Sequence, residues 1–237
     1  MKTVLLLALL FAPLAVSAKS LTVFVALCDN ARQGIAPVPA KIGNGDDPAN
    51  NLYWGCSDGM KTYFRKSAKW TLTKTEKPEE EHILERLTFT HKASKTTLVA
   101  HAYRGRNMAE CLKDFFTALR DAGKDDLVTF IGHNGLMDTG VMFPKDAGDD
   151  DARSSAIILC CISDRYFEPH LKSYNARPLL LTRQLMYPGS FILHDCIEVW
   201  LKDGSLAAHR EAAAKAYAKN QKISTKAART IFSKLEE

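Results

Sequence analysis

The sequence predicts an α/β protein, a three-layer α/β/α sandwich around a mostly parallel central sheet. Segments with strand and helix patterns alternate along the chain, which is the order that parallel strands joined by crossover helices require. Residues Ala156–Leu159 form an unbroken apolar run with two adjacent isoleucines. A short run of this kind is typical of a strand buried on both faces of a parallel sheet.

The first eighteen residues resemble a secretory signal peptide. Lys2 supplies a positive charge, an apolar stretch follows, and Val16-Ser17-Ala18 offers small residues for cleavage. The apolar stretch is too short to span a bilayer, and no later segment is long enough, so no integral membrane segment is expected after cleavage. We therefore expect a single domain over 19–237 in a periplasmic or secreted protein.

The charge balance is only mildly basic. The net charge is +5, and removing Lys2 leaves about +4. Much of the excess lies among alanines in the last thirty or so residues, which indicates the exposed face of a helix and no nucleic-acid surface. Neither G-x-x-x-x-G-K nor G-x-G-x-x-G occurs in the chain, so no nucleotide cofactor is expected.

The strands are predicted from apolar or β-branched runs bounded by turn residues. The expected strands are Leu21–Leu27, Trp70–Thr75, Leu87–Thr90 paired as a hairpin with Thr96–Tyr103, Leu127–Gly132, Ser155–Cys161 and Pro178–Thr182.

The helices are predicted from apolar periodicity and caps. The clearest one follows Asn107, with Glu110 completing a capping box and Gly123 placed as a C-cap. The expected helices are Asn50 or Asn51 to Lys66, 107–123, Phe167–Tyr174, Phe191–Lys202 and one or two surface helices within Leu206–Glu237.

Two expected strands end in residues with catalytic chemistry. The strand through Ile131 continues into His133, and the strand through Leu159 continues into Cys160 and Cys161. Functional groups gather at the carboxyl edge of parallel sheets. A thiolate attacks carbonyl carbon, and a nearby imidazole favours the thiolate and can protonate a leaving amine. Successive strand residues face opposite ways, so at most one of the two adjacent thiols can face a shared site.

Other strand ends add candidates for the same edge. Gly135 could offer its backbone N–H to an oxyanion. Asp29, Arg104 and Arg183 are candidates for binding substrate, although the arginines could instead pair with the acidic cluster Asp146–Asp151. No C-x-x-C or H-x-x-x-H spacing supports a metal site.

The order of these strand ends resembles the caspase-like cysteine peptidases, which include caspases, metacaspases, legumains and gingipains. In that family a His-Gly follows the third core strand and the nucleophilic cysteine follows the fourth. The resemblance implies His133 as the catalytic histidine and, from Cys160-Cys161-Ile-Ser163, Cys161 as the nucleophile. This sequence departs from the family in having Asn134 between His133 and Gly135.

The sequence therefore predicts an exported cysteine endopeptidase with a Cys161–His133 dyad acting on a peptide or protein substrate. The alternative is a non-catalytic exported binding or assembly protein with the same fold. A weaker alternative is a thiol-dependent redox protein that uses Cys160 and Cys161, although adjacent cysteines form strained disulfides. The pairing of the six cysteines is left open by the sequence.

Overall fold

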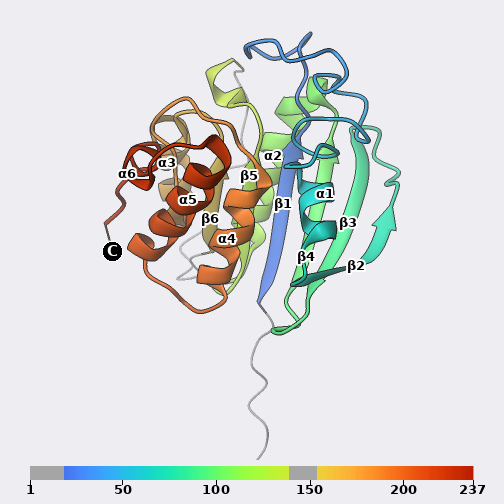
Figure 1. The fold of residues 1–237 in the computed structure, drawn as a ribbon. Helices are drawn as coiled ribbons and strands as arrows, with labels where there is room; N and C mark the ends of the chain where they lie inside the picture. Colours follow the sequence, from blue (N-terminus) through green and yellow to red (C-terminus); the bar gives the residue numbers. More distant parts are fainter. Residues whose placement is uncertain (1–18, 139–153, 237) are drawn as a thin grey trace, which may run out of the picture.

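The computed structural model describes residues 19–138 and 154–236. The expected signal peptide and the acidic cluster Asp146–Asp151 lie outside these residues. The described chain forms a seven-stranded sheet in the order β2-β3-β4-β1-β5-β6-β7 (Figure 1). The strands are β1 (Ser20–Ala26), β2 (Trp70–Glu76), β3 (Ile83–His91), β4 (Thr97–Tyr103), β5 (Leu127–Ile131), β6 (Ser155–Leu159) and β7 (Arg177–Leu180).

The sheet is mixed but mostly parallel, as the alternation of elements predicted. β4, β1, β5, β6 and β7 run parallel to one another, while β3 pairs antiparallel with both β2 and β4. The β2–β3 hairpin extends one side of the sheet. The prediction of an α/β fold is therefore confirmed.

Helices cover both faces of the sheet and enclose two separate apolar cores (Figure 1). One face carries α1 (Met60–Lys66), α4 (Ser190–Trp200) and α5 (Leu206–Gln221), and the other carries α2 (Met108–Asp121) and α3 (Ser163–Ser173). Strand residues alternate between the two cores: Val23 and Val25 enter the first, whereas Phe24 and Ala26 enter the second.

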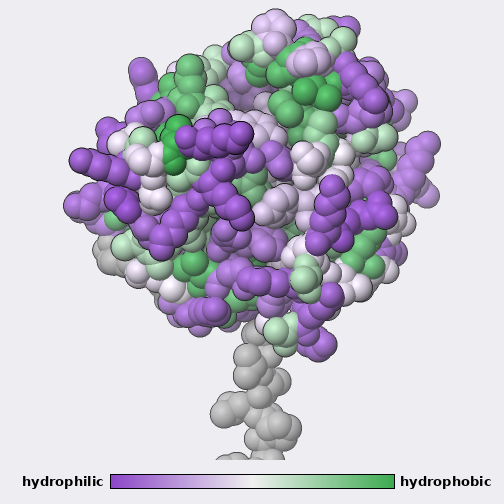
Figure 2. All heavy atoms as spheres, in the orientation of Figure 1, coloured by the Kyte–Doolittle hydropathy of each residue, from purple (hydrophilic) through white to green (hydrophobic). Residues whose placement is uncertain are grey.

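The C-terminal segment folds as α5 and a short α6 (Thr225–Arg229). Lys215, Lys219 and Lys222 are exposed, as the charge pattern predicted. Figure 2 shows hydrophilic side chains over much of the face that carries α4 and α5. Beyond α6 the chain runs beside the end of β7, where Thr182 and Phe232 form an antiparallel bridge.

The predicted helix from Asn50 or Asn51 to Lys66 is wrong over most of its length, because only Met60–Lys66 is helical. Asn51 is fully buried and does not cap a helix. Its Oδ1 accepts the N–H of Cys28 at 3.0 Å, and its Nδ2 donates to the Cys28 carbonyl at 2.8 Å. These contacts fasten the loop to the end of β1, and turns occupy the chain up to Gly59.

The predicted capping box of α2 is also absent. Asn107 has φ −98° and ψ 37°, outside the extended region in which a cap side chain reaches the helix N–H groups, and it makes no such bond. The helix ends at Asp121, so Ala122 and not Gly123 is its C-cap. α3 begins at Ser163, four residues earlier than predicted.

Candidate functional site

The ends of β5 and β6 bring His133 and Cys161 to matching positions at the carboxyl edge of the sheet. These strands are adjacent and parallel, and Ile131 pairs with Leu159 in the last register position. The N–H of Gly132 donates to the Leu159 carbonyl at 3.2 Å, which continues the pairing one residue further. His133 and Cys161 each lie two residues beyond the Ile131–Leu159 pair, one after β5 and the other after β6.

Alternation along the strands separates the two adjacent thiols. Leu159 belongs to the core under α1, α4 and α5, whereas Cys160 belongs to the opposite core. Cys160 is fully buried, and this burial raises the pKa of its thiol well above the ordinary value. Cys161 is half-buried. The thiol that the sequence favoured is therefore the one that solvent can reach.

A buried amide joins the two strand ends directly. Asn134 is fully buried, and its Nδ2 donates to the backbone carbonyl of Cys161 at 2.6 Å. Its Oδ1 accepts the N–H of Leu136 at 3.2 Å. The residue that interrupts the expected His-Gly pair thus holds the histidine segment against the cysteine segment.

Cys161 lies in a strained turn between β6 and α3. The next residue, Ile162, is in the left-handed region with φ 51° and ψ 42°. A β-branched side chain rarely adopts this conformation, and such backbone strain clusters at functional sites. The Cys161 Sγ accepts the N–H of Met186 at 3.4 Å. The Cys161 thiol also donates to the Met186 carbonyl at 3.7 Å, so both backbone groups of Met186 fix the position of the sulfur.

His133 is paired with a carboxylate that the sequence patterns did not indicate. Its Nε2 bonds to Oδ2 of Asp138, and only 9% of the His133 side chain is exposed. The 3₁₀ turn Gly135–Met137 returns the chain so that Asp138 meets a histidine five residues earlier. An imidazole oriented by a carboxylate through one nitrogen can act as a base through the other, here Nδ1.

Tyr53 and Cys28 are buried residues, and Tyr53 lies near the thiols of both Cys28 and Cys161. Burial raises the pKa of Tyr53, and the neighbouring thiols of Cys28 and Cys161 raise it further. Burial likewise raises the pKa of Cys28 to about 11, against the effect of a hydrogen bond with Tyr53. Cys28 therefore stays a neutral thiol at neutral pH and does not compete with Cys161 as a nucleophile.

The backbone N–H of Gly135, predicted as an oxyanion donor, is engaged within the 3₁₀ turn. It donates to the carbonyl of His133 at 3.0 Å. The residue is buried, and a Cβ at this position would lie 2.3 Å from Cγ of Met108. Its role toward an oxyanion stays a prediction, and that role requires the contact with His133 to open.

The predicted substrate-binding residues Asp29, Arg104 and Arg183 make no described hydrogen bond or ion pair with Cys161 or His133. Asp29 is buried, and its Oδ1 accepts the N–H of Ala31 at 3.0 Å. Arg104 pairs through Nη1 with Asp46 at 2.6 Å, so its described partner differs from the expected acidic cluster. Arg183 is exposed just after β7. Substrate binding by these residues stays a prediction.

The six cysteines all lie within the described residues, and none forms a disulfide.

Across 19–138 and 154–236, no group of three or more His, Cys, Asp or Glu side chains is arranged to hold a metal ion. Within the same residues, no helix combines the length and apolar character needed to cross a bilayer.

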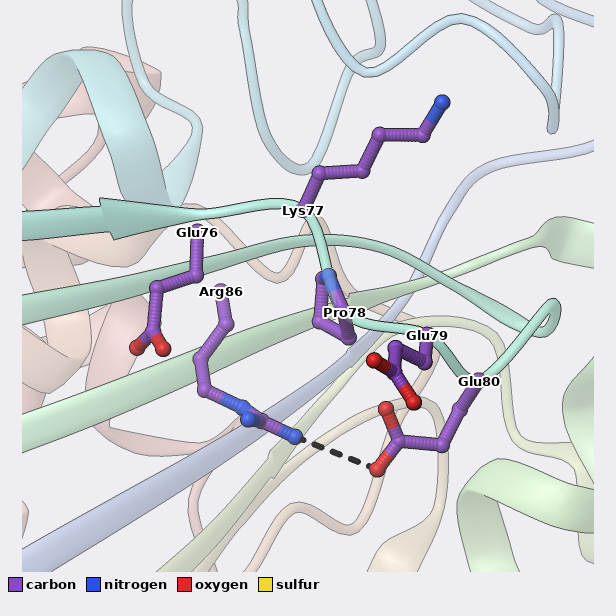
Figure 3. A pocket seen from close by; sticks show the side chains of 6 residues that line it. All are labelled: Glu76, Lys77, Pro78, Glu79, Glu80 and Arg86. Carbon is purple, nitrogen blue, oxygen red and sulfur yellow. Dashed lines mark ion pairs between the residues drawn. The ribbon is translucent and has the colours of Figure 1, made fainter.

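A separate open pocket of about 630 Å³ lies on the β2–β3 hairpin. Figure 3 shows its charged lining, in which Arg86 Nη2 and Glu80 Oε1 are 3.5 Å apart. β4, β1 and β5 separate this hairpin from β6 in the sheet. The pocket is therefore not part of the Cys161 site.

Comparison with protein-family models, with curated proteins and with solved structures finds no match to this chain.

Proposed function

We propose that this protein is an exported cysteine endopeptidase of the caspase-like type, in which Cys161 is the nucleophile and His133 the general base and acid. The observation that carries the proposal is the equal offset of the two residues beyond the Ile131–Leu159 pair. Adjacent parallel strands lie about 4.8 Å apart, a spacing that suits an imidazole and a thiol acting together. The apolar leader-like segment at 1–18 supports export.

In this mechanism the Cys161 thiolate attacks the carbonyl carbon of a peptide bond. His133 first accepts the thiol proton and then gives it to the departing amine, so the acyl group remains as a thioester on Cys161. Water activated by His133 hydrolyses the thioester and restores the free thiol. Asp138 acts as a positioning residue that keeps the imidazole in one tautomer and orientation.

Thiol labelling tests the nucleophile with a built-in control, because Cys56 is the other half-buried thiol. Burial raises the pKa of Cys56, so its thiolate is scarce at neutral pH. We expect iodoacetamide at pH 7 to modify Cys161 at least about tenfold faster than Cys56, as followed by peptide mass spectrometry. The His133→Ala variant should lose most of this difference.

Peptide hydrolysis tests the reaction itself. The full chain from residue 19 should cleave an unfolded protein substrate, and Cys161→Ala should abolish cleavage while Cys56→Ala leaves it intact. If Cys161 and Cys56 react at equal rates and no substrate is cleaved, the peptidase proposal is wrong. That outcome favours the alternative, a binding protein that uses the same strand-edge loops.

A further inference from the structure

We propose that Ser67, His194 and Asp195 form a second nucleophilic site, which hydrolyses small carboxylic esters and is independent of Cys161. Ser67 directly follows α1, and the other two residues lie within α4. A cavity of about 440 Å³ opens between these helices, and its lining includes Tyr63, Lys66, Ser67 and His194. This volume accommodates a small-molecule substrate.

The three side chains are linked in the order that nucleophilic catalysis requires. The Ser67 Oγ lies 2.9 Å from His194 Nε2, and His194 Nδ1 lies 2.9 Å from Oδ1 of Asp195. With the proton on Nδ1, the ring donates to Asp195 and accepts the Ser67 hydroxyl proton at Nε2. Both distances are within the range of a nucleophile, base and orienting acid.

The backbone and the surrounding rings favour the same arrangement. The N–H of Lys69 donates to Ser67 Oγ at 3.2 Å, which leaves the hydroxyl hydrogen for His194. The imidazole packs edge-on against Tyr63 and Phe64, with ring centroids 5.4 and 5.5 Å away. His194 is only 9% exposed. Its orientation is therefore set by packing as well as by Asp195.

The charged residues that line the cavity are two lysines and one carboxylate, Asp58. Lys66 and Lys69 both line it. Lys69 pairs with Glu198 at 2.8 Å, whereas Lys66 has no ion pair among the described residues. An ammonium group in the same cavity as Ser67 would stabilise the negative charge that develops on the ester carbonyl oxygen.

The reaction balances without any cofactor. The Ser67 Oγ bonds to the ester carbonyl carbon as its proton moves to His194 Nε2. The ester C–O bond then breaks, and the alkoxide leaves as an alcohol with that proton. Water attacks the acyl-serine and gives one proton to His194, which returns it to Ser67 Oγ. The products are a carboxylic acid and an alcohol.

A second serine–histidine pair provides a matched control. Ser94 Oγ lies 2.8 Å from Nδ1 of His91. There, however, the Ser94 N–H donates to the same ring nitrogen at 3.2 Å, and the Ser94 hydroxyl donates to Thr96. The contact lies within the β3–β4 turn and borders none of the cavities described here, so Ser94 should not be activated.

The experiment uses the chain from residue 19 with Cys161→Ala, so that the outcome does not depend on the proposed peptidase. A fluorophosphonate probe should modify Ser67, as mapped by peptide mass spectrometry, and p-nitrophenyl acetate should be hydrolysed. Ser67→Ala should abolish both signals. His194→Gln should lower both rates by about 10²–10⁴-fold, and Ser94→Ala should leave them unchanged.

Asp195→Asn gives a variant that is expected to fold, because its side chain is 47% exposed. It should lower the labelling rate at Ser67 by at least about tenfold while the circular dichroism spectrum is preserved. The proposal is overturned if Ser67 stays unlabelled, or if Ser67 and Ser94 are labelled at the same rate. Labelling of Ser67 that is unaffected by Asp195→Asn also overturns it.

Discussion

The orientation of the His133 ring depends on one side chain in the loop after β5, Asp138. The sequence indicated His133 and Cys161 because each follows a recognisable apolar strand. It gave no sign of Asp138, which lies in a loop without periodicity and reaches His133 only because the 3₁₀ turn Gly135–Met137 reverses the chain. A local turn, and not a spacing rule, therefore supplies the third member of the candidate site.

Replacing Asp138 by Asn should weaken the reactivity of Cys161 without unfolding the protein. Asn keeps the shape of the side chain but cannot hold the imidazole in the required tautomer by charge. We expect the rate of peptide cleavage to fall on the order of 10²-fold or more, mainly in kcat. An unchanged kcat in Asp138→Asn would show that this carboxylate is a surface contact only.

His101 should make stability depend on acid pH. Burial, and then the charge of Arg86, lower the pKa of His101 to about 4, and the Arg86 Nε donates to its Nδ1 at 3.3 Å. Between pH 6.5 and 4 the unfolded chain binds a proton that the folded chain does not, so the free energy of unfolding decreases as the pH falls.

We expect His101 alone to contribute a loss of about 2 kcal/mol between pH 7 and pH 5. Urea unfolding at these two pH values measures the loss. His101→Gln removes the titrating group and should show a smaller difference between the two pH values than the unaltered chain. Equal differences in the two proteins would exclude His101 as the source.

At the level of elements, the buried side-chain amides of Asn51 and Asn134 connect segments that the hydrophobic periodicity of the sequence does not relate to each other. Asn51 was predicted as a helix cap because its type and position suit one, yet its side chain instead satisfies both backbone groups of Cys28. Asn134 similarly connects the segment after β5 to Cys161, two residues beyond the end of β6. An Asn side chain offers the same donor and acceptor to a cap, a turn or a distant strand, so its partner depends on the tertiary structure.

Removing the Asn134 amide should loosen the junction of the two strand ends. Asn134→Ala leaves the partly buried Cys161 carbonyl without its donor, at a cost of about 1 kcal/mol in the free energy of unfolding. We also expect slower labelling of Cys161, because its turn loses a tether. Urea unfolding and iodoacetamide kinetics measure the two effects. Gly123→Ala, at an exposed site, is the control: it should leave Cys161 labelling unchanged and should not lower the free energy of unfolding.

For the whole molecule, the alternation of elements was enough to predict the mostly parallel sheet and the edge where the candidate site lies. The predicted hairpin of Leu87–Thr90 with Thr96–Tyr103 is confirmed as β3–β4. The strand predicted at Trp70–Thr75 is β2, but its pairing with β3 was not predicted, because β2 carries several exposed polar residues and little apolar periodicity. The state of the six cysteines depends on distances between remote segments, which composition does not contain. The structure leaves all six as thiols, and four of them are buried.

A thiol count tests this arrangement over the whole chain. Ellman's reagent should modify only the half-buried Cys56 and Cys161 quickly in the folded protein, and all six cysteines after unfolding in urea. The buried thiols are shielded from solvent and disfavour ionisation. A count below six in unfolded, unreduced protein would reveal a disulfide and contradict the structure.

The antiparallel bridge between Thr182 and Phe232 has a consequence for the newly made chain. Ser233 donates to the Leu181 carbonyl and Arg183 donates to the Ile231 carbonyl, so residues 231–233 shield the outer border of the sheet just past β7. These residues leave the ribosome fifty positions after Thr182. Until then the border offers unpaired backbone groups to any neighbouring polypeptide. A folding chain in which residues 231–233 have not yet paired with this border is thus vulnerable to aggregation.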